Sequence, residues 1–302
     1  MKHLVSFADS RMRRSLSRLS GQAESFGLFD TIHLLDEGSL SIDFRERFKD
    51  KLIAGSKGYG YWSWKPEVIL NLLNEIDEGD HLLYIDAGCH MNTDGKKRLI
   101  EYFDILEKDN NGIVAFQAVQ PTTENSSLKY DGRKLFDQPN HQYIKGDLLE
   151  YFDAKENPTI VNAQAIGAGI ILIKKCDQAL RIIKEWRKII WERFDLLDDT
   201  PSISPNLPGF IENRHDQAIW TLLCLKHHVK TLSAYEYWYP KKNITKLKPD
   251  WSALHEFPIH AKRDKDLGFL RNSIWQFKLL IIKLKRISSK LKMIVSKDTQ
   301  QC

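Results

Sequence analysis

Residues 82–89 read Leu82-Leu83-Tyr84-Ile85-Asp86-Ala87-Gly88-Cys89, an apolar run that ends on one aspartate and a glycine. A short apolar run of this kind predicts a buried strand. An acid at the carboxyl end of a buried strand stands where open α/β sheets bind their ligands. We therefore expect an α/β fold whose ligand site includes Asp86.

Some twenty residues earlier, residues 58–66 read Gly58-Tyr59-Gly60-Tyr61-Trp62-Ser63-Trp64-Lys65-Pro66. Glycines let a backbone approach a ligand closely, aromatic rings offer flat faces to a base or a sugar, and a lysine supplies a compact charge for phosphate. Together with Asp86, this stretch suits a nucleotide-sugar. The same composition also suits a structural interpretation, in which residues 58–66 form a loop over the edge of the core and Asp86 only caps the following turn. The order of the motifs along the chain favours the functional interpretation.

The first half of the chain alternates between strand-like and helix-like segments, which predicts a mainly parallel sheet with helices on both faces. Lys65-Pro66 fits a helix start, because proline is tolerated in the first turn. Gln120–Gln142 is polar and loop-like. The expected strands are His3–Ala8, Thr31–Leu35, His81–Ile85 and Ile113–Gln117, and the expected helices run from Asp9 and Ser10 to Ala23, over Phe44–Leu52, from Lys65 to Glu78 and over Gly95–Lys108.

The second half predicts a glycine kink that runs into a strand over Gln164–Ile173, and a Pro/Gly/Ser-rich flexible loop over Thr200–Glu212. An aromatic-rich late strand is expected over Thr231–Tyr239. The expected helices are Lys145–Phe152, Asp177–Phe194 and Arg214–His228.

The charge of the 302-residue chain is unevenly placed. Residues 262–302 carry eleven Lys and Arg against three Asp and Glu, a net charge of +8, so the rest of the chain is net −3 within the total of +5. A slightly acidic body argues against nucleic acid as a partner, and a basic tail favours an anionic surface. We expect a catalytic domain over residues 1–264 and a separate tail over residues 265–302.

Four scattered cysteines without metal-like spacing fit a reducing compartment. We see no secretory signal and no run of the roughly eighteen apolar residues that span a bilayer. The sequence therefore predicts a cytoplasmic protein.

Several motifs recur in a definite order: the strand-ending Asp9, Gly58–Pro66, Tyr84–Cys89, Gly167-Ala168-Gly169 and Asn213–Gln217. In this order the chain resembles the GT-A fold glycosyltransferases, specifically a bacterial group associated with lipopolysaccharide and capsule assembly. The signature of that group looks like GYGYWxWKP, YxDAGC and HDQ, the last at His215–Gln217. The resemblance covers roughly residues 3–264. It implies a Rossmann-type nucleotide-binding sheet and transfer of a sugar from a nucleotide diphosphate, such as a UDP-sugar, to a lipid-linked glycan or another oligosaccharide.

The resemblance also implies site residues. Asp216 would face the sugar and take the acceptor proton, as an inverting enzyme requires. In a retaining enzyme Asp216 would only bind sugar hydroxyls. If it has no role in the reaction, it is a negative charge at a helix start, where the helix dipole favours it. Asp9 would lie near the nucleotide or cap its helix, or both. Asp86 and Asp216 are the expected catalytic residues, and the expected donor-binding residues are Asp9, Lys57, Gly58, Tyr59, Gly60, Tyr61, Trp62, Lys65, Asp86, Gly88, Gly167, Gly169, His215, Gln217 and Arg263.

The resemblance raises the question of whether the chain uses a divalent cation, Mn²⁺ or Mg²⁺, as a cofactor. Asp86 takes the place of the first acid in the Asp-x-Asp signature, where two carboxylates hold the cation against the diphosphate. The second acid is replaced by Gly88, which puts metal dependence in doubt. His260 is placed like a late metal-binding histidine, although a lone histidine is more often structural. Without a metal, the positive charge must come from Lys57, Lys65, Lys262 or Arg263.

The tail has its own pattern. On a helical wheel, Leu270, Ile274, Phe277 and further apolar residues fill about one half, while lysines and arginines fill the other. Such a helix suits an anionic membrane interface, with packing on the catalytic domain and a coiled-coil seam as the alternatives. We expect a peripheral protein on the inner face of the cytoplasmic membrane.

Two other functions stay open. A nucleotidyltransferase on a similar sheet would need a Gly/Arg/Lys-rich loop after the first strand, and Asp9–Arg14 has further arginines but no glycine. A catalytically degenerate, membrane-associated scaffold would explain Gly88.

Overall fold

The computed structural model describes residues 1–242 and 248–264. The predicted amphipathic helix over residues 265–302, and with it the boundary between catalytic domain and tail, lies outside the described residues. Within the described ranges, no helix carries an apolar stretch long enough to cross a membrane.

A six-stranded sheet forms the centre of the fold, with strand order β2-β1-β3-β6-β5-β7. The neighbours β1–β2, β1–β3 and β5–β7 are parallel, whereas β6 runs antiparallel to both β3 and β5. The prediction of a mainly parallel sheet is confirmed, with β6 as the reversed strand. The strands are β1 (Lys2–Phe7), β2 (Thr31–Leu35), β3 (His81–Ile85), β5 (Ile113–Gln117), β6 (Ile166–Lys174) and β7 (Lys230–Ser233), while β4 (His90–Met91) and β8 (Ile259–His260) form a second, two-stranded sheet.

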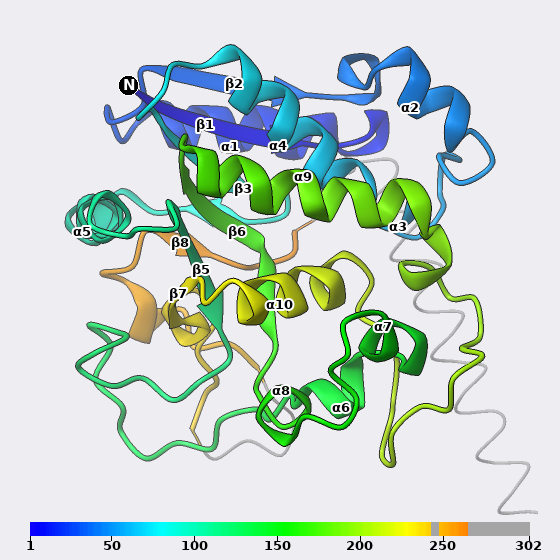
Figure 1. Cartoon of the computed structure of the whole chain (residues 1–302). Coiled ribbons are helices and arrows are strands. Elements are labelled where there is room, and N and C mark those ends of the chain that lie inside the picture. The colour runs from blue at the N-terminus through cyan, green and yellow to red at the C-terminus, as the bar shows by residue number, and fades with distance from the viewer. Residues whose placement is uncertain (243–247, 265–302) are drawn as a thin grey trace, which may run out of the picture.

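Helices cover both faces of the large sheet (Figure 1). One face packs under α4 (Trp64–Glu75), α9 (Asp177–Glu192) and α10 (Asp216–Lys226), and the other packs under α1 (Arg13–Glu24) and α5 (Lys96–Glu107). The shorter helical elements are η1 (Ser10–Met12), η2 (Glu37–Ser39), α2 (Ile42–Arg47), α3 (Gly58–Tyr61), η3 (Thr93–Gly95), α6 (Asn140–Tyr143), α7 (Gly146–Tyr151), α8 (Pro158–Val161), η4 (Phe194–Leu196), η5 (Ala234–Glu236) and η6 (Ser252–Leu254).

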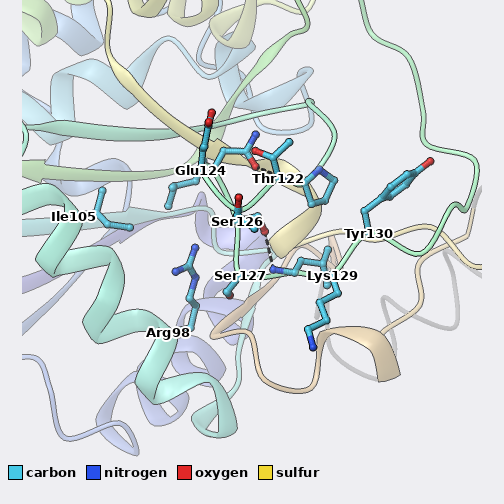
Figure 2. Close-up of a pocket in the computed structure, with 13 residues that line it drawn as sticks. Arg98, Ile105, Thr122, Glu124, Ser126, Ser127, Lys129 and Tyr130 are labelled. Atoms are coloured by element: carbon cyan, nitrogen blue, oxygen red, sulfur yellow. Dashed lines mark hydrogen bonds between the residues drawn. The ribbon is translucent and has the colours of Figure 1, made fainter.

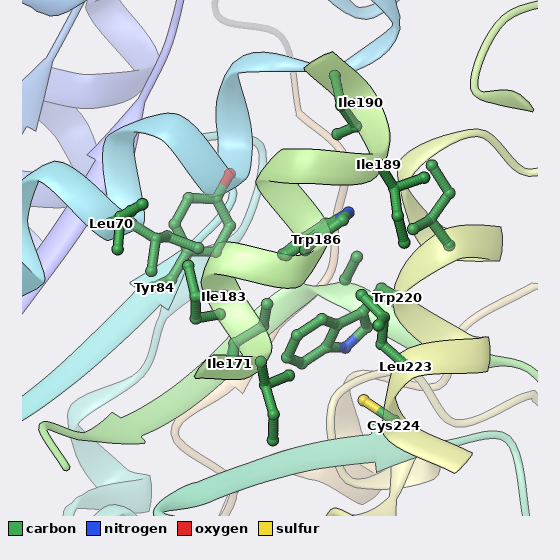
Figure 3. Packing of buried hydrophobic residues seen from close by; sticks show 14 of the residues in the cluster. Leu70, Tyr84, Ile171, Ile183, Trp186, Ile189, Ile190, Trp220, Leu223 and Cys224 are labelled. Atoms are coloured by element: carbon green, nitrogen blue, oxygen red, sulfur yellow. The ribbon is translucent and has the colours of Figure 1, made fainter. Parts of the chain in front are cut away.

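The larger core lies between α9, α10 and the sheet. Figure 3 shows Trp186 of α9 and Trp220 of α10 close to one another, and their ring centroids are 4.8 Å apart. Both tryptophans are fully buried, as is Tyr84 of β3 in the same cluster. Because each large aromatic side chain buries roughly 150–250 Å², this cluster fixes α9 and α10 firmly on the sheet. The start of α10, at Asp216, is thereby held in place.

Three sequence predictions about local structure are wrong. The helix expected over Phe44–Leu52 is α2, which begins earlier and ends at Arg47. The strand expected over Thr231–Tyr239 ends at Ser233, because the Ser233 side chain caps a 3-10 helix by accepting from the backbone N–H of Tyr235. The helix expected to begin at Arg214 begins at Asp216, since His215 has a φ of 53° and lies outside helical geometry.

Candidate active site

Asp86 lies directly after β3, at the carboxyl edge of the sheet. Its backbone N–H donates to the carbonyl of Gly169 at 2.8 Å, and its Oδ1 accepts from the Tyr84 hydroxyl at 2.7 Å. A Cβ added to Gly169 would come within 2.8 Å of Asp86 Oδ2. Glycine at this position of β6 therefore leaves room for the Asp86 carboxylate, which is 37% exposed.

Lys65 brings the two predicted catalytic acids together. Its side chain is only 2% exposed, and its Nζ donates to Asp216 Oδ2 at 2.6 Å and to the Ala168 carbonyl at 2.9 Å. Asp86 Oδ1 lies 3.3 Å from the same Nζ. An ammonium has three protons, and it faces three oxygens here. The structure thus joins residues that lie on α4, β6, α10 and the loop after β3.

Burial and charge act against one another in this cluster. Burial alone would lower the pKa of Lys65, but the carboxylates of Asp216 and Asp86 outweigh burial and raise that pKa. Burial raises the pKa of Asp216, whereas the Lys65 ammonium opposes the rise. Burial and the nearby Asp86 raise the pKa of Tyr84 well above its usual value. Tyr84 therefore stays protonated and donates to Asp86.

The predicted Gly/aromatic motif forms a left-handed turn. Five consecutive residues, 58–62, have positive φ values of 59°, 49°, 84°, 58° and 60°. Trp64 Nε1 donates to the Gly58 carbonyl at 3.1 Å. Side chains are excluded at both glycines, because a Cβ at Gly58 would lie 2.3 Å from the Trp62 ring and one at Gly60 would lie 2.9 Å from Leu52.

Strain of this kind is concentrated among the predicted site residues. Left-handed geometry costs an L-residue roughly 1–2 kcal/mol, and such strain clusters at functional sites. In residues 1–242 and 248–264, seven non-glycine residues have positive φ, and five of them belong to the predicted site: Tyr59, Tyr61, Trp62, His215 and Arg263.

The His215 ring packs against two aromatic side chains of this turn. Its ring centroid lies 5.1 Å from that of Tyr61 and 5.9 Å from that of Trp62. Its Nδ1 lies 2.8 Å from the Leu197 carbonyl, which can only accept, so Nδ1 carries the proton. Burial lowers the pKa of His215 and favours the neutral ring. Lys57 lies beside the same cluster and forms an ion pair with Asp199 at 3.3 Å.

Two other predicted residues have structural partners. Asp9 caps η1, and its buried carboxylate accepts from the backbone N–H of Arg11 at 3.2 Å and from Arg11 Nε at 2.8 Å. A Cβ at Gly167 would lie 2.6 Å from the Tyr237 hydroxyl, so this glycine makes room for a tyrosine. Gln217 is half-buried in the first turn of α10.

The residues expected around a metal ion do not form a metal site. His260 Nε2 lies 2.9 Å from the Leu254 carbonyl, and its ring stacks on Trp251. Asp86 Oδ1 already contacts the Tyr84 hydroxyl and the Lys65 ammonium. Among the residues that the structure describes, no three His, Cys, Asp or Glu side chains are grouped closely enough to hold a metal. The donor set that the described residues offer here therefore does not fit a divalent cation.

Two contacts of the candidate site are absent from the sequence predictions. Tyr84 lies within the predicted strand His81–Ile85 but has no predicted role, although residues two apart on a strand share a face. The two-residue spacing between Tyr84 and Asp86 therefore indicated that their side chains could meet. The Ala168 carbonyl, which accepts from Lys65, had no signal in the sequence, because every residue has a carbonyl.

A pocket of about 730 Å³ lies away from these residues, between α5 and the loop after β5 (Figure 2). Arg98 and Ile105 of α5, Leu232 of β7 and residues 121–130 line it, and no predicted site residue does. The buried Glu236 shapes this loop, because it accepts from Ser126 Oγ at 2.6 Å and from Arg98 Nη2 at 2.7 Å. The pocket is thus a separate feature of the surface.

No protein-family model matches the sequence, and no curated protein matches it. Solved structures are similar at low identity. A glycosyltransferase involved in glycosylation of the major capsid of PBCV-1 has 11% identity and a TM-score of 0.43, covering 88% of this chain and 98% of its own. Mouse xyloside xylosyltransferase 1 has 13% identity and a TM-score of 0.40, covering 79% and 87%.

A third similar structure is WbbM, a bifunctional glycosyltransferase, with 14% identity and a TM-score of 0.43, covering 87% of this chain and 44% of its own. With TM-scores below 0.5, none of these likenesses carries an argument about function.

Proposed function

We propose that the chain is a glycosyltransferase that moves a sugar from a nucleoside diphosphate donor, a UDP-sugar in the first instance, to a lipid-linked glycan in cell-surface polysaccharide synthesis. The observation that carries the proposal is the meeting of Asp86, Lys65 and Asp216 at the carboxyl edge of the sheet. Lys65 Nζ lies 2.6 Å from Asp216 and 3.3 Å from Asp86. A buried ion cluster beside a strained aromatic turn is costly to maintain, and it is typical of a functional site.

Asp86 is the acid that a donor meets first in this proposal. Its carboxylate is 37% exposed, against 8% for Asp216. Tyr84 and Lys65 hold Oδ1 of Asp86. The other oxygen, Oδ2, lies close to Gly169, where the missing side chain leaves room for it. Hydroxyl groups of a bound sugar can donate to such a carboxylate. Asp86 would thereby orient the sugar, and orientation is worth several kcal/mol of a transfer barrier.

Asp216 is the proposed base that takes the proton of the acceptor hydroxyl. Lys65 holds Oδ2 and leaves Oδ1 to receive the proton. Because burial raises the pKa of Asp216, the carboxylate is a stronger base than an exposed aspartate. In this scheme the bond from the acceptor oxygen to the sugar carbon forms as the bond to the diphosphate breaks, and the nucleoside diphosphate leaves. If the outcome is retention of configuration, Asp216 binds the sugar instead.

Lys65 is a positioning residue in this proposal. At 2% exposure its ammonium faces the two carboxylates rather than solvent. It therefore fixes the orientation of both acids and opposes the rise that burial causes in the pKa of Asp216, and a direct contact with a donor phosphate is left to more exposed cations. The strained turn would place Tyr59, Tyr61 and Trp62 against the donor.

A thermal-shift panel tests the donor class. UDP-, GDP-, CMP- and dTDP-sugars are added to the protein with and without manganese, since a ligand of the folded state raises the melting temperature. We expect one nucleotide class to stabilise the protein and the Asp86→Ala variant to lose the response to the sugar nucleotide. A panel without any stabilising nucleotide would contradict the proposal.

Membrane association is proposed from charge and periodicity alone. Residues 265–302 would hold the enzyme on the inner face of the cytoplasmic membrane, where each Lys or Arg near an anionic surface adds about 1 kcal/mol. Co-sedimentation with vesicles of varied anionic content compares the full chain with residues 1–264. Salt should weaken the binding of the full chain, because exposed charges are screened beyond about 10 Å at 0.1 M. Equal sedimentation of both forms would contradict the assignment.

A further inference from the structure

The place of a second metal-binding acid is filled by backbone. A Cβ added to Gly88 would lie 3.3 Å from the Cα of Arg263 and 3.5 Å from its carbonyl carbon. The backbone N–H of Asp264 donates to the Gly88 carbonyl at 3.0 Å. A segment from the far end of the domain therefore crosses position 88 at van der Waals distance. A carboxylate side chain at 88 would have to push this segment away.

Asp264 clamps this segment to the body of the domain. Its carboxylate lies 3.2 Å from His90 Nε2 and 3.5 Å from Arg18 Nη1. Arg18 also donates to the carbonyls of Ala87 at 2.8 Å and Cys89 at 3.0 Å, on either side of Gly88. The position of residue 263 over the end of β3 is thus fixed from several directions.

The Arg263 side chain takes no part in these contacts of Asp264 and Arg18. The φ of Arg263 is 54°, in the left-handed region. Its side chain is exposed, and within residues 1–242 and 248–264 it has no hydrogen bond or ion pair. Its charge nevertheless reaches the site, because it opposes the rise that burial causes in the pKa of Cys89. Its Cα lies beside position 88, two residues after Asp86, so an exposed cation that has no ion pair among the described residues is available there for an anion.

We propose that Arg263 binds the diphosphate of the donor and that this site works without a divalent cation. The inference rests on the proposed function. The residues around Asp86 do not fit a metal ion, and the charge that a metal would supply must come from the protein. A guanidinium binds phosphate oxygens in a bidentate way. It would also stabilise the charge that develops on the diphosphate as the sugar departs.

The test is titration calorimetry of the full chain with UDP, UMP and uridine, in EDTA and in Mn²⁺. We expect UDP to bind in EDTA within twofold of its affinity in Mn²⁺. Arg263→Gln should weaken UDP at least tenfold and uridine less than twofold, and Arg263→Lys should recover part of the loss. Arg181→Gln is the matched control, since Arg181 is an exposed arginine of α9. Melting temperatures verify that each variant is folded.

The outcomes separate the two proposals. If UDP binds only in Mn²⁺, or if Arg263→Gln binds UDP as the wild type does, this inference is overturned while the proposed function stands. If no nucleoside diphosphate or its sugar binds under either condition, the proposed function fails, and the inference fails with it.

Discussion

Replacing Lys65 by methionine removes the ammonium from the buried cluster and keeps an apolar stem of similar length. Asp216 loses its 2.6 Å partner, the Ala168 carbonyl loses its donor, and Asp86 loses a partner at 3.3 Å. Removing one partner of a buried ion pair costs about 3–5 kcal/mol. At about 2 °C per kcal/mol for a chain of this size, we expect Lys65→Met to lower the melting temperature by roughly 6–10 °C.

Calorimetry of single and double variants measures this loss and its cause. In Lys65→Met/Asp216→Asn the uncompensated carboxylate is gone, so we expect the double variant to recover about half of the Lys65→Met loss, about 1.5–2.5 kcal/mol. The losses of the two single variants are then not additive. Lys188→Met is the control, because Lys188 is 66% exposed on α9, and it should change the melting temperature by less than about 2 °C. A Lys65→Met protein with the melting temperature of the wild type would refute the reasoning that Lys65 is part of a buried ion cluster. So would stability losses of the two single variants that simply add up in the double variant.

Four further outcomes are expected. Asp86→Asn should abolish transfer, measured as release of nucleoside diphosphate, while the melting temperature stays within a few degrees of the wild type; normal turnover would remove Asp86 from the site. Asp216→Asn should lower turnover at least a hundredfold with nearly unchanged donor affinity, whereas the reverse pattern would indicate a binding role. Gly169→Ala should weaken activity, because its methyl would press on Asp86 Oδ2 from 2.8 Å, and a fully active variant would show that the carboxylate can move freely. The wild-type rate should fall as pH drops through the pKa of Asp216, which burial raises, and in Lys65→Met this acid limb should move to higher pH, since the opposing charge is gone; an unmoved limb would assign it to another group.

The order of strands and helices followed from the sequence, because apolar runs and helical periodicity are local signals. Strand β3 was predicted over His81–Ile85, directly before Asp86, and the structure has it there. The error at Thr231–Tyr239 has a local cause. Aromatic residues favour strands, but Ser233 caps a 3-10 helix and ends the strand early.

The shape of the aromatic turn was not predictable in the same way. Two glycines indicated unusual backbone geometry, but tyrosine and tryptophan avoid positive φ for steric reasons. Only the packing of Trp62 on Gly58 and of His215 on Tyr61 and Trp62 explains why they adopt it. Tertiary contacts decide this geometry.

The cluster of Lys65, Asp86 and Asp216 was likewise beyond a local argument. Lys65 and Asp216 are 151 residues apart in sequence, and their meeting depends on how α4 and α10 pack on the sheet. The sequence therefore named both acids and the lysine, but it assigned the lysine to a phosphate. Its burial, which only the fold reveals, makes it a partner of the acids instead.

The most direct test of the central claim is release of nucleoside diphosphate from sugar nucleotides by the purified full chain in EDTA. We expect one class among UDP-, GDP-, CMP- and dTDP-sugars to be split slowly in water, or faster with an acceptor sugar, and Asp86→Asn to reduce this rate to the uncatalysed background. A chain that releases no nucleotide from any of the four classes, with or without added Mn²⁺, or an Asp86→Asn variant as active as the wild type, would contradict the account.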